Sequence, residues 1–427
     1  MPSVHDKTWY EATVDRGAAR PQLSGTVEAD ACVIGGGLAG LTAALELVRR
    51  GKKTILLEAQ RVAWAASGRN GGFVSNGFAE GLDEITRKVG LEAARHLYRL
   101  SCFGTEFVRR EIAVTDPTIK MGDGWIGARR FNDADGLKAY RDHLARDFGD
   151  ERQFCTTEET RAKLATARYY QSLVDTTAFH MHPLRYALMI AAKAEAAGAK
   201  IHENSAAANV SRQASGWEVK TGSGRVKAAH VIHTVSSLDR TLHPGTGRAI
   251  LPVATYVAVT EPLQQESIRT RSAASDQRRA GNYYRLVDDG RILWGGAITT
   301  RVSEPGHLAE RMKRDMLSVY PRLGNPHIDY AWAGLMGYTR HFMPLIGGDG
   351  QGQWWATAFG GHGMNTTAMG GILLARAIAA GDDEYRRFAP YAPVWAGGPF
   401  GRIGVQAGYW WMQARDLIDE AKSRRAA

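Results

Sequence analysis

The sequence predicts a two-domain α/β fold (α+β over the whole chain), in which a parallel-sheet domain is interleaved with an antiparallel-sheet domain. Residues 31–58 follow the pattern of strand, glycine turn, helix and second strand. A buried-strand pattern of the same kind returns at 229–235, after a long excursion. Residues 252–261 alternate, and 282–296 read as a hairpin that turns at 288–290. A chain of 427 residues is long enough for two joined cores.

The first unit has the features of a dinucleotide site. Gly35, Gly37 and Gly40 stand in the order G-x-G-x-x-G between an apolar strand and a helical pattern. Gly35 permits a sharp turn, Gly37 lets the backbone approach a pyrophosphate, and Gly40 lets helix and strand pack closely. Glu58 ends the next strand, where it can accept hydrogen bonds from both adenosine ribose hydroxyls and disfavours NADP. NAD and FAD both fit this unit, and the alternative is a glycine-rich turn without a nucleotide.

Two further segments point to the same ligand. Residues 61–72 are dense in small residues and include Ser67, Arg69 and Asn70. This composition suits backbone that wraps around a flat, polar ligand, and the alternative is a surface loop. Residues 354–380 repeat the order of strand, glycine turn and helix, so a second helix N-terminus could face the cofactor.

The remaining periodicity predicts helices and short strands. Residues 82–113 read as helix with a break near Gly90, and 118–130 as a strand pair that turns at 122–124. Residues 169–182 read as a loop rich in aromatic and polar residues. The tail, about 407–427, reads as a helix that is aromatic first and charged afterwards. We expect this helix to pack onto the body, with a membrane foot as the alternative.

We expect four parts in the domain organisation. They are an N-terminal arm (1–28), a discontinuous nucleotide-binding domain (29–80, 183–240 and 335–385), a substrate domain built on a sheet with helical insertions (81–182 and 241–334), and a C-terminal helical tail (386–427). No internal repeat and no low-complexity segment interrupts this arrangement.

Composition excludes several classes of protein. The net charge of +10 comes from scattered arginines rather than a basic tract, which indicates a generally basic surface and no nucleic-acid partner. Cys32, Cys102 and Cys155 lie far apart and form no metal-ligand pair, so we expect no metal. The polar N-terminal residues lack the apolar core of a secretion signal, and no apolar run is long enough for a membrane span. The sequence therefore predicts a cytoplasmic protein.

Three separated blocks carry a resemblance to a known family: the glycine unit ending at Glu58, the loop from Ser67 to Gly72, and Pro344 to Gly347 followed by Gly360 to Gly363. Together they resemble the FAD-dependent glycine/D-amino-acid oxidase (DAO) family, and more closely its gamma-glutamylputrescine oxidoreductase-like branch. The resemblance implies a Rossmann-like FAD-binding domain with an interleaved antiparallel-sheet substrate domain. The cofactor-binding residues that it implies are Gly35, Gly37, Leu38, Ala39, Gly40, Glu58, Ala59, Arg61, Ala66, Ser67, Arg69, Asn70, Gly71, Gly72, Ala208, Thr234, Gly360, Gly361, His362, Gly363, Met364 and Asn365.

The resemblance also implies how FAD is held. The loop from Ser67 to Gly72 would lie beside the flavin ring, Ala208 and Thr234 near the adenine, and the amides of Gly361 to Met364 at the carbonyl edge of the ring. Some family members attach flavin covalently through a C-terminal cysteine, but no cysteine follows Cys155 here. Members with a histidine linkage carry it where this chain has Ser67 and its neighbours. We therefore predict non-covalent FAD.

The implied reaction is oxidation of a carbon–nitrogen bond of an amine or amino acid by hydride transfer to the flavin. Imine hydrolysis would follow, with oxygen as acceptor and hydrogen peroxide as product. One alternative is a dehydrogenase of D-amino or N-substituted amino acids that uses a quinone or another carrier. Another is a flavin-binding protein without turnover. The candidate catalytic and substrate-binding residues are Tyr256, Tyr284, Arg285, Trp294, Arg340, His341 and His362, with Tyr283 and Tyr338 as further aromatic candidates.

These assignments leave alternatives open. For each aromatic residue the alternative is packing within the sheet, and Arg285 can bind a substrate carboxylate or serve the structure. No lysine lies between Lys227 and Lys313, where some family members place one above the flavin to activate oxygen. Arg340 and His341 would alter the charge of the pocket relative to many members of the family. That pair indicates a substrate other than gamma-glutamylputrescine.

Overall fold

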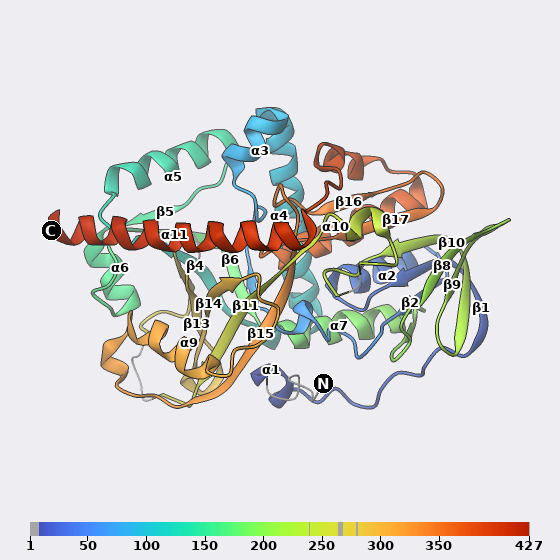
Figure 1. Ribbon diagram of the computed structural model, residues 1–427, viewed down its shortest axis with the longest axis horizontal. Helices are drawn as coiled ribbons and strands as arrows, with labels where there is room; N and C mark the ends of the chain where they lie inside the picture. Colours follow the sequence, from blue (N-terminus) through green and yellow to red (C-terminus); the bar gives the residue numbers. More distant parts are fainter. Residues whose placement is uncertain (1–7, 239, 264–267, 279–280, 427) are drawn as a thin grey trace.

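Two β-sheets, one in each half of the molecule, carry the architecture of the protein (Figure 1). The computed structural model describes residues 8–238, 240–263, 268–278 and 281–426. Sheet A lies in the half that contains the glycine unit, and sheet B lies in the other half. The mixed α/β class that the sequence predicts is confirmed.

Sheet A has a parallel centre, as predicted. In the spatial order given at the end of this paragraph, the second to sixth strands all run parallel to one another. The first strand lies at the edge and is antiparallel to the second. A hairpin extends it beside β10. The strands in spatial order are β16 (Leu345–Gly348), β17 (Gln353–Thr357), β10 (Gly224–His233), β1 (Gly25–Ile34), β2 (Thr54–Leu57) and β7 (Lys200–His202), with the hairpin of β8 (Asn209–Gln213) and β9 (Gly216–Lys220).

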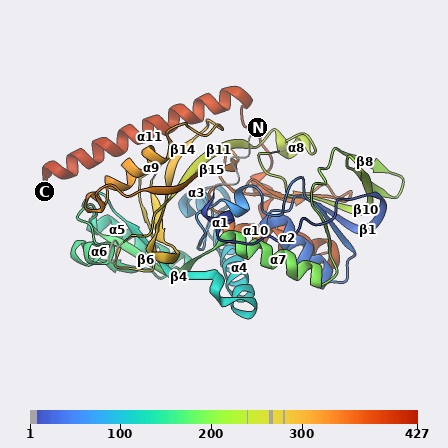
Figure 2. The same cartoon turned by 90° about the horizontal axis from the view of Figure 1, so that it is seen from below.

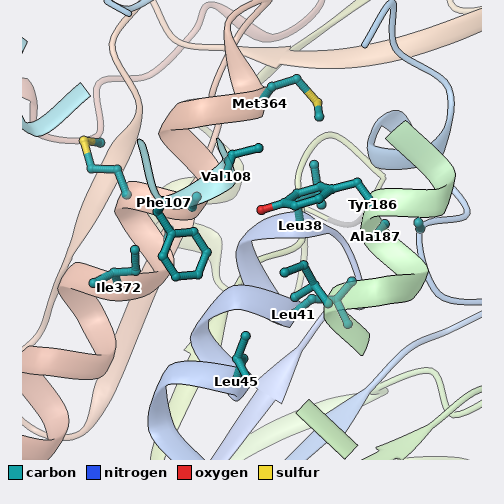
Figure 3. Close-up of a cluster of buried hydrophobic side chains, with 14 of the residues drawn as sticks. Leu38, Leu41, Leu45, Phe107, Val108, Tyr186, Ala187, Met364 and Ile372 are labelled. Carbon is teal, nitrogen blue, oxygen red and sulfur yellow. The ribbon is translucent and has the colours of Figure 1, made fainter. Parts of the chain in front are cut away.

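Four helices pack together beside this sheet: α2 (Leu38–Arg49), α4 (Leu91–Thr115), α7 (Pro183–Ala196) and α10 (Gly363–Ala380). Their apolar side chains meet in one cluster, shown in Figure 3. Leu38, the first residue of α2, and Met364, in the first turn of α10, both belong to this cluster. The N-termini of α2 and α10 are therefore held in the same region of the molecule.

Sheet B is antiparallel except between β12 and β4, which run parallel. Its longest pairings join β11 to β15 and β4 to β6. Every residue of β11 is buried, because layers of the protein cover both faces of the sheet there. The strands in spatial order are β15 (Ile328–Tyr338), β11 (Leu251–Thr260), β14 (Ile292–Thr299), β13 (Tyr283–Leu286), β12 (Ala273–Asp276), β4 (Lys120–Ala128), β6 (Ser172–Met181) and β3 (Phe73–Val74), with β5 (Gln153–Cys155) beside β6.

Two local predictions for this sheet are wrong. The expected strand pair at 118–130 is the single strand β4, because shifts in its register with β6 absorb Gly122 and Gly124 without a turn. The expected loop at 169–182 contains β6. The predicted break near Gly90 is confirmed, since Gly90 has φ +82 between α3 (Leu82–Val89) and α4. The hairpin at 288–290 is confirmed as well.

A long helix, α11 (Gly398–Ala426), runs along the outside of sheet B (Figures 1 and 2). It begins earlier than the predicted residue 407. Among the helices of the described ranges, none combines the length and apolar character that a membrane crossing requires.

The division into four domains stays a prediction. The other helices are α1 (Trp9–Ala12), α5 (Ala134–Phe148), α6 (Thr157–Leu164), α8 (Pro244–Gly247), α9 (Leu308–Leu317) and the 3₁₀ turns η2 (Ala66–Gly68), η3 (Pro117–Ile119), η4 (Asp288–Gly290), η5 (Pro321–Leu323) and η6 (Glu384–Tyr391).

Candidate cofactor and substrate site

The turn after β1 is shaped by contacts that only glycine permits. Gly35 has φ +110, and a side-chain carbon at Gly40 would collide with the carbonyl oxygen of Gly35. Thr234, directly after β10, donates its hydroxyl to the carbonyls of Ile34 and Gly35, at 2.8 and 3.0 Å. Thr234, which the family resemblance places near the adenine, thus uses its hydroxyl inside this turn. The successive glycines present only backbone to a ligand, as a pyrophosphate requires.

Glu58 lies beside the same turn, at the end of β2. Its Oε2 accepts a hydrogen bond from the Gly36 amide at 2.7 Å, and its Oε1 accepts one from the Gln60 amide at 2.9 Å. Burial raises the pKa of Glu58, while these amides stabilise its ionised form. A carboxylate fixed in this orientation fits the ribose hydroxyls of an adenine dinucleotide.

Two helix N-termini meet at one edge of sheet A. Helix α2 follows β1 and α10 follows β17, and both strands run parallel to β10, so both turns lie at the carboxyl ends of the strands. The N-cap residues, Gly37 and His362, make no side-chain capping bond. Ser67 instead approaches α2, where its Oγ accepts a hydrogen bond from the Leu38 amide at 3.0 Å. Helix N-termini stabilise negative charge on a group that lies against them.

The loop from Ser67 to Gly72 is built by its own hydrogen bonds. The Asn70 side chain donates to the carbonyls of Ala66 and Ser67, at 2.9 and 3.1 Å, and accepts from the Gly72 amide at 2.8 Å. Gly72 has φ +78, and a side-chain carbon there would collide with the Met181 carbonyl oxygen. This loop is therefore a fixed part of the structure, and the surface-loop alternative does not describe it.

Arg69 joins this loop to sheet B. The Arg69 Nε donates to the carbonyl oxygen of Ala333 at 3.0 Å, and the indole of Trp332 donates to the carbonyl oxygen of Arg69 at 2.9 Å. The Arg69 side chain is buried, and burial lowers its pKa. These bonds fix the distance between the glycine-rich loop and the sheet that covers it. The loop therefore packs directly on sheet B at Trp332 and Ala333.

Several predicted cofactor residues turn their side chains elsewhere. The Arg61 Nε forms an ion pair with the buried Glu203 at 2.8 Å. The amide of Asn365 donates to the carbonyls of Gly77 and Ser101, both at 3.3 Å. The backbone of these residues remains near the candidate site, but their side chains hold neighbouring segments in place. Ala59 and Ala208 are exposed alanines, which offer only backbone and a methyl group.

Arg285 serves the structure in this fold. Its side chain is 1% exposed. Nε donates to the Gly71 carbonyl at 2.8 Å, Nη2 to the Met181 carbonyl at 2.9 Å, and Nη1 contacts the Nδ1 of His180 at 3.2 Å. Every guanidinium nitrogen thus has a partner within the protein. Of the two interpretations that the sequence leaves open, the geometry favours the structural one, in which Arg285 supports the loop from behind.

Three aromatic candidates lie on the face of sheet B that packs against α9. Tyr284 stacks on Trp294 with a centroid separation of 4.6 Å, and its hydroxyl accepts a hydrogen bond from Tyr320 at 3.2 Å. Tyr256 is buried on the same face and lies under Arg311 of α9. Alternate residues of a strand point to opposite faces, and the glycine-rich loop lies on the other face. We therefore assign Tyr256, Tyr284 and Trp294 to the core beneath α9.

A different set of residues faces the loop. The ring of Tyr283 lies next to Gly71 and 5.3 Å from the ring of Phe73, and burial raises the pKa of Tyr283 to about 12. Tyr338 contacts Gly360 and Gly361, the turn before α10. Thr255 hydrogen bonds to the hydroxyl of Tyr283. Phe73 and Thr255 were not identified as candidates from the sequence. Phe73 directly follows the loop from Ser67 to Gly72, and Thr255 directly precedes the candidate Tyr256.

The last three candidates lie at different places. Arg340 is exposed. His341 accepts a hydrogen bond from the Met343 amide at 3.2 Å and lines a cavity of about 390 Å³ together with Glu80 and Tyr391. His362 Nε2 approaches the carbonyl oxygen of Ser75 at 3.1 Å, and burial lowers the pKa of His362. A neutral His362 that donates to Ser75 fixes the turn before α10.

The residues present fit FAD. The glycine turn, Glu58 and two helix N-termini without a capping bond from their own N-cap side chains supply backbone donors and one carboxylate, which is the donor set that a dinucleotide with an electron-accepting ring needs. Among the described residues, no group of His, Cys, Asp and Glu could hold a metal ion.

Comparisons with known proteins agree with this geometry. A model of the family described as "DAO: FAD dependent oxidoreductase" matches residues 30–377. The "Probable oxidoreductase OrdL" of Haemophilus influenzae is 33% identical over 393 residues, covering 89% of each chain. The gamma-glutamylputrescine oxidoreductase of Escherichia coli is 28% identical over 398 residues, covering 91% of this chain and 93% of that protein.

Solved structures with the same fold include both oxidases and dehydrogenases. The glycine oxidase of Geobacillus kaustophilus has a TM-score of 0.73 at 16% identity, covering 86% of this chain and 99% of its own. The L-proline dehydrogenase of P. horikoshii has a TM-score of 0.69 at 20% identity, covering 86% and 98%. These likenesses support the two-domain fold and do not distinguish the two kinds of electron acceptor.

Proposed function

The chain belongs to the DAO family of FAD-dependent oxidoreductases, and we propose that it oxidises the carbon–nitrogen bond of a small amine or amino acid. One observation carries the proposal. The loop from Ser67 to Gly72 is fixed to the N-terminus of α2 through Ser67 and to sheet B through Arg69, and the N-terminus of α10 lies in the same region of the molecule. A flavin ring held there would have protein amides on one side and a substrate space on the other.

In this proposal the backbone holds most of the cofactor. The turn from Gly35 to Gly40 would bind the pyrophosphate, and Glu58 would accept hydrogen bonds from the ribose hydroxyls. The amides at the start of α10 would face the ring and stabilise negative charge on it. We propose that FAD is bound without a covalent link.

When bound, FAD supplies the acceptor for a hydride from the carbon beside the amine, and the imine product is hydrolysed by water. The protein orients the substrate with an aromatic wall formed by Phe73, Tyr283 and Tyr338. Such rings can hold an amine through apolar and cation–π contacts. The phenol of Tyr283 stays protonated at neutral pH, because burial raises its pKa to about 12. It therefore orients the substrate as a hydrogen-bond partner and does not remove the amine proton.

The electron acceptor is the finer part of the proposal. We favour oxygen, with release of hydrogen peroxide, although no lysine between Lys227 and Lys313 is available to activate oxygen from strands β11 to β14. A dehydrogenase that reduces a quinone is the second candidate, because the fold also occurs in a dehydrogenase. We propose the cytoplasm as the compartment, since Cys32, Cys102 and Cys155 are free and two of them are buried.

An anaerobic substrate panel tests the proposed function. The purified holoprotein is mixed with primary, secondary and N-substituted amines and with both enantiomers of amino acids, and flavin absorbance near 450 nm is followed, the usual band of the oxidised ring. Bleaching by one chemical class is the expected result. Subsequent admission of oxygen, with a peroxide assay, distinguishes an oxidase from a dehydrogenase. Bound flavin that no amine or amino acid bleaches would overturn the proposal in favour of a protein without turnover.

A further inference from the structure

The outer face of α11 is an apolar surface that the fold leaves uncovered. Six large apolar side chains of this helix are between 52% and 79% exposed. They recur at helical spacing, so they form one stripe along the helix. Val394 and Trp395, just before the helix, are also exposed. The six residues are Phe400, Ile403, Trp410, Trp411, Leu417 and Ile418.

The inner face of α11 is already bound to the body. Tyr409 packs against Leu251 and Val253 of sheet B. Arg402 donates to the carbonyl of Thr300 at 2.9 Å, and Glu420 pairs with Arg130 at 3.2 Å. The helix is therefore fixed along its length, and the apolar stripe belongs to the folded molecule. A stripe of this length exceeds the isolated apolar side chains that ordinary surfaces show.

Charge on the helix is divided between its two faces. Among the described side chains of α11, Asp416 and Glu420 are buried and Asp419 is half-buried, whereas Arg415 and Lys422 are exposed beside the stripe. The Arg415 guanidinium lies 5.0 Å from the ring of Trp411. The exposed face is thus apolar and positive, on a chain with a net charge of +10. This combination of aromatic residues and cations is typical of a helix that lies on anionic lipid.

The shape of the helix suits a flat partner. Its 29 residues extend for about 43 Å at 1.5 Å per residue, and Figure 2 shows it straight along one edge of the molecule. A second copy of the chain would bring another positive face to the stripe, without exposed acidic partners for Arg415 and Lys422 among the described side chains of the helix. Anionic headgroups can pair with both cations while the aromatic rings enter the interface.

We propose that the outer face of α11 docks this protein on the surface of a membrane that contains anionic lipid. The helix lies in the plane of the interface and does not cross the bilayer. Trp410 and Trp411 are central to the stripe and supply its largest apolar area. Docking is independent of the reaction proposed above, since it uses none of the residues of the flavin site.

Vesicle flotation of the full-length holoprotein tests this proposal. Vesicles of phosphatidylcholine mixed with phosphatidylglycerol are compared with vesicles of phosphatidylcholine alone, at low and at high salt. We expect binding to the mixed vesicles, a blue shift of tryptophan emission, and weaker binding at high salt. The double variant Trp410→Ser/Trp411→Ser should lose at least about tenfold in partitioning, because two aromatic side chains leave the interface. Arg415→Gln/Lys422→Gln should bind the mixed vesicles more weakly than the parent protein does, and its binding to vesicles of phosphatidylcholine alone should equal that of the parent.

A matched control removes exposed apolar side chains elsewhere. Phe103→Ser/Val114→Ser changes two exposed residues of α4 and should bind vesicles as the parent protein does. Bound flavin and the thermal midpoint are measured for every variant, so that misfolding is recognised. Equal binding by the Trp410/Trp411 variant, or no binding by the folded parent, would overturn the proposal. A dimer in light scattering that the Trp410/Trp411 variant loses, without vesicle binding, would assign the stripe to a second copy of the chain.

Discussion

Sheet A and sheet B hold their parts of the candidate site by different means. Beside sheet A, the groups that we propose to bind the cofactor are backbone amides of two glycine turns, with Glu58 as the main side chain. Beneath sheet B, the site depends on which face of each strand a side chain occupies, as Tyr283 and Tyr284 show. The first arrangement can be recognised in the sequence from the spacing of the glycines. The second arises only when both layers of the sheet are in place.

The largest effect should come from the glycine turn. Gly40→Ala places a methyl group against the Gly35 carbonyl, so the turn must move. We expect a loss of about 3 kcal/mol in unfolding free energy and at least about a hundredfold weaker FAD binding. Denaturant unfolding and flavin titration measure these effects. Gly306→Ala is the control, since nothing lies within 4 Å of its added carbon. Equal effects of the two changes would contradict the role of the turn.

Arg285→Met distinguishes the structural role of this residue from substrate binding. The change leaves the carbonyls of Gly71 and Met181 without their donor in a buried region. We expect a loss of about 3 kcal/mol in unfolding free energy. A stable variant with a raised KM for carboxylate substrates, and an unchanged KM for simple amines, would restore the carboxylate-binding interpretation.

Protonation of His180 should make the unfolding free energy of the protein depend on pH. Burial and the nearby Arg285 lower the pKa of His180 to about 3, whereas an unfolded histidine titrates near 6.5. Below pH 6.5 the unfolded state therefore binds a proton that the folded state does not, and stability falls as the pH falls toward 3. Between about pH 6 and pH 5 the stability advantage over His180→Gln should shrink by roughly 1 kcal/mol. A constant difference across that range would show that His180 is protonated in the fold.

Glu58→Gln should have a smaller effect, confined to the cofactor. Loss of the carboxylate weakens two charge-assisted hydrogen bonds to the ribose, and we expect FAD to bind about tenfold more weakly at neutral pH. Burial raises the pKa of Glu58, so the affinity of the parent should fall as acidification protonates it. The variant should lack this dependence, and Glu28→Gln, an exposed carboxylate on β1, should retain it. A pH profile shared by all three proteins would exclude Glu58 as its source.

The comparison explains what the sequence could and could not predict. The order of Gly35, Gly37 and Gly40 is visible in the chain because each position must lack a side chain. The face that Tyr256 occupies could not be predicted because all ten residues of β11 are buried, so the alternation of apolar residues does not say which of them lie under α9. A register shift between Ala254 and Tyr256 also interrupts the pairing of β11 with β14, so the facing of Tyr256 does not follow from simple alternation. The packing of α9 against one face of sheet B shows on which face Tyr256 lies. That contact joins residues distant in the chain, so the sequence does not reveal it.

The most direct test of this account uses two neighbouring tyrosines on opposite faces of β13. Anaerobic flavin reduction by the best substrate is measured in single turnovers for Tyr283→Phe and Tyr284→Phe. We predict that Tyr283→Phe slows reduction about tenfold, because it loses one hydrogen bond at the substrate face. Tyr284→Phe should reduce its flavin at the parent rate, with only a modest loss of stability from the lost bond to Tyr320. Slow reduction in Tyr284→Phe alone would show that the substrate lies on the α9 face and would contradict the account.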